Sequence, residues 1–215
     1  MNNENRKIIF LFPLLIYLIS ALVGCTSSQE RRILVVHSYE ETYTAYPEFN
    51  RLIAKQFKKE GVNADIRTLY LDCESYKEET ELKRMRYLLD SVSGDWRPEV
   101  ILVNEDQATY SLLKCGDPLV KEVPVVFAGV NYPNWELLKQ YPNATGFHDK
   151  IGFVQNAEMA RKLFGDSVRL FTLLDSTFLD VQIRKDARKQ LAGHRVTGFM
   201  DYPDIPSVEQ YRLVR

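Results

Sequence analysis

Three short polar segments could bind or transform a small molecule, and each directly follows an apolar run: His37-Ser38-Tyr39, Asn104-Glu105-Asp106 and Ala128-Gly129-Val130-Asn131. Their hydroxyl, carboxyl and amide groups can form hydrogen bonds, and a carboxyl group can also serve as a general base. Asp72-Cys73 and Asp175-Ser176-Thr177 follow two further apolar runs. The chemistry of this chain therefore depends on whether these segments meet in space.

Nucleophilic catalysis by Ser38 would need a base beside it, and His148-Asp149 or Glu105 could supply one. His37 is unsuited to that role, because adjacent residues on a strand point to opposite faces of the sheet. The G-x-S-x-G turn that presents a nucleophilic serine does not occur in the sequence. We therefore interpret the segment at 37–39 as a strand end whose polar groups cap a neighbouring helix or contact a ligand.

Glu105 and Asp106 could bind a cation or act as an acid or base. The enzymatic alternative for this chain is a hydrolase or transferase that uses one of them. A simpler interpretation is that Asn104 or Asp106 caps the helix that follows, because amides and carboxylates satisfy the open N–H groups of a first helical turn. We favour capping, alone or combined with ligand contact, over catalysis and metal binding.

Neither a cofactor nor a metal is expected. Gly129 lacks the further glycines of a dinucleotide or phosphate loop, and the sequence has no C-x-x-C motif or His/Cys cluster for zinc. If Cys25 is lipidated, Cys73 and Cys115 remain as a disulfide pair or as two buried thiols, and we favour the thiols. Four tyrosines near the predicted crevice have two interpretations: they form an aromatic wall that stacks on an organic ligand, or they are ordinary half-buried surface residues. The residues concerned are Tyr39, Tyr43, Tyr46 and Tyr132.

The elements that must position these groups follow a repeating pattern. Short β-branched runs alternate with amphipathic stretches, which is typical of βαβ units on a parallel sheet. The first block is predicted to hold strands at 33–36, 64–71, 100–103 and 124–127, and helices at 47–60, 78–92 and 107–114. The fourth strand is predicted to break at Gly129. The polar segments should then meet at the carboxyl ends of the strands, where ligands of open α/β sheets bind.

A second block follows the loop at 131–143. It is predicted to hold strands at 144–148, 168–174 and 195–200, helices at 154–164 and 178–191, and a last helix from Ser207. A sheet with so few strands would be incomplete. We therefore expect the chain to be truncated relative to its relatives or to be one part of a longer architecture.

The composition is that of a globular protein, with 45% hydrophobic and 12% aromatic residues. The net charge at pH 7 is −1. A nucleic-acid partner would require a basic face that displaces counterions from phosphates, so the charge argues against such a partner.

The N-terminal segment predicts an extracytoplasmic protein in the periplasm or at the cell surface. Arg6-Lys7, an apolar run at 8–23 and Gly24-Cys25 have the layout of a secretion signal. Leu22-Val23-Gly24-Cys25 resembles the bacterial lipoprotein box, which makes 1–24 a signal peptide, 25–32 a tether and Cys25 the lipidated residue. The alternative is an uncleaved membrane anchor, because the apolar run approaches the roughly 20 residues that span a bilayer.

Three segments of the chain, in this order, resemble the substrate-binding-protein-like domains of ABC-transporter solute receptors: ILVVHSYEETYTAYPEFNRLIAKQF, PEVILVNEDQATYSLL and VPVVFAGVNYPN. The likeness is greatest to domains of this kind at the N-terminus of bacterial sensor histidine kinases. The resemblance implies an α/β periplasmic-binding-protein-like fold with a parallel-sheet, Rossmann-like first lobe at 33–141. Residues 144–215 would form the start of a second α/β lobe. Relatives usually complete that lobe and cross back to the first.

The resemblance implies a non-enzymatic module that closes on a small molecule and signals its occupancy to a membrane partner such as a histidine kinase. A solute-binding lipoprotein that serves an ABC permease is the alternative. The predicted ligand-binding residues are Ser38, Tyr39, Glu105, Asp106, Gly129 and Asn131 in the first lobe, with Asp175 and Ser176 in the second.

Overall fold

The computed structural model describes residues 29–73, 75–76, 78–166, 170–172, 174, 178–193 and 199–201. Cys25 with the secretion signal, the pair Asp175 and Ser176, and the predicted helix from Ser207 lie outside these ranges. Within them, no helix combines the length and the hydropathy that crossing a bilayer requires.

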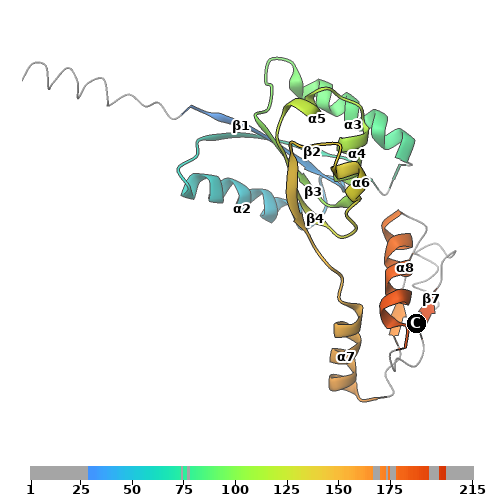
Figure 1. Cartoon of the computed structure of the whole chain (residues 1–215). Helices are drawn as coiled ribbons and strands as arrows, with labels where there is room; N and C mark the ends of the chain where they lie inside the picture. Colours follow the sequence, from blue (N-terminus) through green and yellow to red (C-terminus); the bar gives the residue numbers. More distant parts are fainter. Residues whose placement is uncertain are drawn as a thin grey trace, which may run out of the picture. The chain divides into compact units, whose positions relative to one another are not determined.

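A five-stranded sheet of the order β2-β1-β3-β4-β5 is the central element of the described chain (Figure 1). Its strands are β1 (Arg31–His37), β2 (Ala64–Tyr70), β3 (Val100–Asn104), β4 (Val125–Val130) and β5 (Ala144–His148). The pairs β1 with β3, β3 with β4 and β4 with β5 are parallel. The α/β fold with a parallel sheet, which the alternation of patterns predicts, is confirmed.

Two details of the sheet differ from the sequence-based prediction. The strand at 144–148, which we assigned to the second block, pairs with β4 and makes the first sheet five-stranded. The predicted break at Gly129 is also wrong, because β4 continues to Val130. The register with β5 shifts between Phe127 and Val130, and this irregularity accommodates the positive φ of 69° at Gly129.

The apolar run of β1 is buried on both faces of the sheet, as a central parallel strand requires. Leu34 and Val36 belong to the main hydrophobic core, and Ile33 and Val35, which alternate with them, are equally buried. This burial holds the first strand in place and thereby positions the polar residues that follow it.

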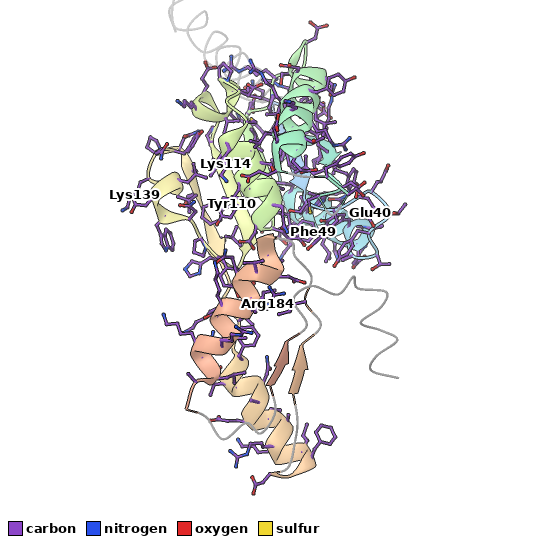
Figure 2. The ribbon with its side chains drawn as sticks, turned by 90° about the vertical axis from the view of Figure 1, so that its right-hand side faces the viewer. Glu40, Phe49, Tyr110, Lys114, Lys139 and Arg184 are labelled. Carbon is purple, nitrogen blue, oxygen red and sulfur yellow. The ribbon has the colours of Figure 1, made fainter. Side chains whose placement is uncertain are left out.

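Three helices cover one side of the sheet: α3 (Glu78–Ser93), α4 (Asp106–Lys114) and α5 (Leu119–Glu122) (Figure 1). Figure 2 shows Tyr110 and Lys114 along α4. The three helices share one core with the strands, to which they contribute Met85, Leu89, Leu112, Leu113 and Val120. Helix α6 (Trp135–Leu138) is a single turn inside the loop after β4, and the sequence did not predict it.

Helix α2 (Tyr46–Lys59) begins one residue before its predicted start and carries the expected apolar stripe. Phe49, Ile53 and Phe57 on this stripe are half-buried, and Leu52 is 47% exposed. Glu48 and Arg51 form a bidentate ion pair on the surface of the helix.

The second block contains α7 (Phe153–Phe164) and α8 (Phe178–Leu191), whose bounds match the predicted helices to within one residue. Strands β6 (Leu170–Thr172) and β7 (Phe199–Asp201) form a parallel two-stranded sheet. Gln190 connects the two helices, because its Oε1 accepts from Phe153 N at 3.2 Å and its Nε2 donates to Ile151 O at 2.9 Å.

Candidate functional site

The strand order places the candidate site between β1 and β3. In the order β2-β1-β3-β4-β5 the direction of chain progression reverses at this pair. Open parallel sheets bind ligands beyond the carboxyl ends of the strands at such a switch point. Ser38 directly follows β1 and Glu105 directly follows β3, so both lie at this point.

Ser38 is fully buried and joins the ends of the two strands. Its hydroxyl donates to Asn104 O at 3.0 Å and accepts from Ala108 N at 2.9 Å. Ala108 lies in the first turn of α4, so Ser38 satisfies one of the N–H groups that the helix cannot pair internally. The interpretation that polar groups of this strand end cap a neighbouring helix is confirmed.

Glu105 occupies the N-cap position of α4 in a conformation that non-glycine residues rarely adopt, with φ 75° and ψ 171°. Its side chain makes no capping hydrogen bond. The prediction that Asn104 or Asp106 caps this helix is wrong, because Ser38 provides the cap from another strand. Backbone strain of this kind costs about 1–3 kcal/mol and clusters at functional sites. Asp72 after β2 is the second described non-glycine residue with a positive φ, at 60°.

The Glu105 carboxyl group is half-buried and has few hydrogen-bond donors around it. Tyr46 donates its hydroxyl to Glu105 Oε2 at 3.1 Å, and the same hydroxyl oxygen accepts from Tyr39 N at 3.0 Å. Burial is the main cause that raises the pKa of Glu105 to about 7; the hydrogen bond from Tyr46 opposes it, and the nearby charge of Asp106 adds to it. The carboxyl group therefore changes charge close to neutral pH.

Tyrosine rings gather beside Glu105. The rings of Tyr39 and Tyr43 stack with centroids 4.8 Å apart, and Tyr43 lies 4.9 Å from Tyr46. On its other side Tyr46 stacks on the buried His37 at 3.8 Å. Three of the four tyrosines that we singled out in the sequence therefore form one cluster, and Tyr43 is its exposed member at 37%.

Asp106 is fully buried and connects α4 to the turn after β4. Its carboxylate accepts from Asn131 N at 2.9 Å, from Tyr132 N at 3.0 Å and from Asn131 Nδ2 at 3.3 Å. Through these three hydrogen bonds Asp106 anchors the turn after β4.

Tyr110 reinforces the same turn. Its hydroxyl donates to Tyr132 O and accepts from Asn134 N at 2.8 Å. Tyr110 was not predicted from the sequence, because a tyrosine in an amphipathic helix carries no local signal for a contact with a loop more than twenty residues away. Burial raises the pKa of Tyr110 to about 12, so its hydroxyl keeps its proton.

Gly129 has a backbone role at this edge. Its φ of 69° favours glycine, and a Cβ atom there would lie 3.3 Å from Asn104 Oδ1. Asn131 Nδ2 also donates to Gly129 O at 3.3 Å. The position thus lets β4 and the end of β3 approach each other closely.

The structure brings together all six residues that the sequence predicts for the first lobe: Ser38, Tyr39, Glu105, Asp106, Gly129 and Asn131. Their contact with a ligand stays a prediction. In the described ranges no group of three His, Cys, Asp or Glu side chains could hold a metal ion. Cys73 and Cys115 are both thiols, as we favoured from the sequence, but they are partly exposed and not fully buried.

Comparisons with known proteins support the fold. The sequence matches no protein-family profile, and no curated protein matches it significantly. Among solved structures, a conserved domain protein from Vibrio cholerae aligns over 83% of this chain and 59% of its own, with a TM-score of 0.63 and 15% identity. The ABC domain of Streptococcus pneumonia in complex with L-Trp aligns over 83% of this chain and 58% of its own, with a TM-score of 0.60 and 17% identity.

A third similar structure is the solute-binding protein of an ABC transporter from R. palustris in complex with 4-hydroxybenzoate. It aligns over 81% of this chain and 47% of its own, with a TM-score of 0.54 and 13% identity. The chain thus spans about half to three fifths of the length of these structures. Together they show that the chain has a periplasmic-binding-protein-like fold.

Proposed function

We propose that this chain is the ligand-binding part of an extracytoplasmic solute receptor that binds a small molecule at the carboxyl edge of the five-stranded sheet. The observation that carries the proposal is Glu105, a half-buried carboxyl group on strained backbone at the switch point between β1 and β3. Structures of the same fold bind L-Trp and 4-hydroxybenzoate, which supports a small organic ligand.

Glu105 and the exposed tyrosine rings supply the contacts of the first lobe in this proposal, and Asp175 and Ser176 supply those of the second. Contacts made from both sides favour a closed form over an open one, so ligand binding shifts the population towards closure. Attachment through a lipid on Cys25, or through an N-terminal helix, keeps this module beside a membrane. Closure is then transmitted to a membrane partner, either a sensor histidine kinase or an ABC permease.

A thermal-shift screen of the purified full chain against small organic solutes tests the proposal. A ligand at 100 times its Kd stabilises the folded state by about 2.7 kcal/mol, which is a shift of several degrees in Tm. Glu105→Ala should abolish the shift, whereas Asp95→Ala, which removes an exposed acid after α3, should leave it intact. A screen in which no solute changes Tm contradicts the proposal.

Enzymatic use of the same site is the second candidate, because a carboxyl group with a pKa of about 7 suits a general base. Ser38 is an unsuitable nucleophile, since it is buried and its hydroxyl donates to Asn104 O. A hydrolase or transferase would therefore use Glu105 to activate water or a second substrate. Incubation of each bound solute with the protein, followed by NMR, separates the two functions: a product that disappears in Glu105→Ala favours the enzyme.

A further inference from the structure

The described loops around Glu105 are mainly acidic. The segments that follow β1, β2 and β3 carry Glu40, Glu41, Asp72, Glu105 and Asp106 (Glu40 is labelled in Figure 2). The Arg84 guanidinium beyond β2 donates to Leu71 O at 3.1 Å and lies 4.2 Å from the centre of the Tyr76 ring.

The tyrosine cluster presents π-electron faces beside this acidic surface. Tyr39 and Tyr43 are stacked, and both rings are partly exposed. Tyr46 is buried behind them and points its hydroxyl at Glu105. A cation within about 6 Å of a tyrosine ring centre is attracted by the negative face of the ring, so the rings and the carboxylate favour the same sign of charge.

Glu105 also has unused hydrogen-bonding capacity. An ionised carboxylate has about four acceptor positions. Tyr46 fills one of them. A ligand that donates hydrogen bonds and carries positive charge would occupy the remaining positions and offset the cost of burying the charge.

On the basis of the proposed function, we infer that the ligand of this site carries an ammonium group, which lies against the rings of Tyr39 and Tyr43 and donates to the Glu105 carboxylate. An anionic group in the same place would face the carboxyl groups of Glu105 and Asp106. The chemical class of the ligand is therefore an organic amine, alone or as part of a larger molecule.

Binding of such a ligand depends on pH in one direction. Below about pH 7 Glu105 is increasingly protonated, so the affinity for the amine falls by up to about tenfold per pH unit, and above that pH it is constant. The groups that face Glu105 are Tyr46, Ser38 and Asp106, and His37 stacks behind Tyr46. Glu105→Gln tests this origin, because the pH dependence of amine binding should disappear in this variant.

Three probes with one aromatic skeleton test the inference: phenethylamine, 3-phenylpropionate and 2-phenylethanol. Isothermal titration of the full chain at pH 8 should detect phenethylamine alone. Glu105→Gln should weaken its binding by about tenfold to a hundredfold, which is the range for loss of a charge-assisted hydrogen bond. Tyr43→Phe should keep most of the affinity, and Tyr43→Leu should lose several-fold. Circular dichroism checks that the variants are folded.

The outcomes distinguish this inference from the function on which it rests. If the carboxylate or alcohol probe binds as tightly as the amine, the ammonium inference is overturned and the receptor function stands. If other solutes of the thermal-shift screen bind instead, their charge decides: amines support the inference, and neutral or anionic solutes overturn it. If no solute binds at all, the proposed function itself is wrong.

Discussion

The first turns of α3 and α4 each bury a carboxylic acid, but they surround it very differently. Asp106 in α4 is 0% exposed and accepts hydrogen bonds from two backbone N–H groups and one amide. Glu81 in α3 is 4% exposed, and neither of its carboxyl oxygens has a hydrogen-bond partner. Burial is the main cause that raises the pKa of Glu81 to about 7; the Arg84 charge opposes it and the Asp72 charge adds to it.

This difference shows that donors, more than burial, decide what a buried acid does. Hydrogen bonds to a charged group contribute about 1.5–3 kcal/mol each, whereas a buried charge without partners is destabilising. Glu105 lies between the two extremes, since it is half-buried and has Tyr46 as a donor. Glu81 and Glu105 therefore both titrate near neutral pH, and only Glu105 follows a strand at the switch point.

The largest expected effect is the loss of the well-satisfied acid. Asp106→Ala should destabilise the protein by about 3–5 kcal/mol, because it leaves Asn131 N and Tyr132 N, in a partly buried turn, without their acceptor. Urea denaturation measures the change. Asp90→Ala, which removes an exposed acid from α3, is the control and should change stability by less than about 0.5 kcal/mol. Equal effects of the two variants would refute the anchoring role of Asp106.

Removal of the unsatisfied acid should have the opposite sign. Because the folded state raises the pKa of Glu81 from 4.5 to about 7, the stability that this group contributes is lost as the pH rises through that interval. Glu81→Leu should therefore stabilise the protein at pH 8, by about 2–3 kcal/mol, and by much less at pH 5.

Urea denaturation at both pH values tests this pH-dependent gain. Glu79→Leu is the matched control on the same helix, since Glu79 is exposed and forms only a surface pair with Lys83. A gain from Glu81→Leu that does not change between pH 5 and pH 8 would show that the acid is already satisfied.

Loss of the Ser38 hydroxyl, a neutral acceptor at the same edge of the sheet, should destabilise the protein less than loss of the Asp106 carboxylate. Ser38→Ala removes the hydroxyl that caps α4, and loss of such a cap costs about 1–2 kcal/mol. Ser91→Ala, which removes an exposed hydroxyl that bonds Leu88 O within α3, should be close to neutral. If Ser38→Ala proves as harmless as Ser91→Ala in urea denaturation, Ala108 N does not depend on the Ser38 hydroxyl.

The smallest effect concerns the backbone of Glu105. Glycine adopts a φ of 75° with little strain, so Glu105→Gly should be more stable than Glu105→Ala by about 1 kcal/mol. Both variants lose the carboxyl group, so the difference between their free energies of unfolding reports the backbone strain at position 105. At the exposed Tyr87 in α3 we expect the reverse: Tyr87→Ala should be more stable than Tyr87→Gly, because alanine is the better helix former. If alanine is the more stable residue at position 105 as well, Glu105 is unstrained.

Local patterns predicted most of the elements but few of their contacts. The apolar run at 33–36 is a strand buried on both faces, and the helical spacing at 178–191 marks the bounds of α8. The strand at 144–148 was recognised, but its pairing with β4 was not, because nothing within a strand specifies its neighbour. No local pattern marks Glu81 as a buried acid, and only the packing around α3 shows that it is 4% exposed.

Periodicity, apolar runs and strand-end polar residues in the sequence alone determined the α/β class and the group of residues at the carboxyl edge of the first sheet. The tertiary structure decided what each of those residues does. Ser38 caps a helix residue 70 positions away, and Asp106 holds a turn 25 positions away. The physical reason is that a hydrogen bond depends on which groups the folded chain brings within about 3 Å, and separation along the sequence does not encode that distance.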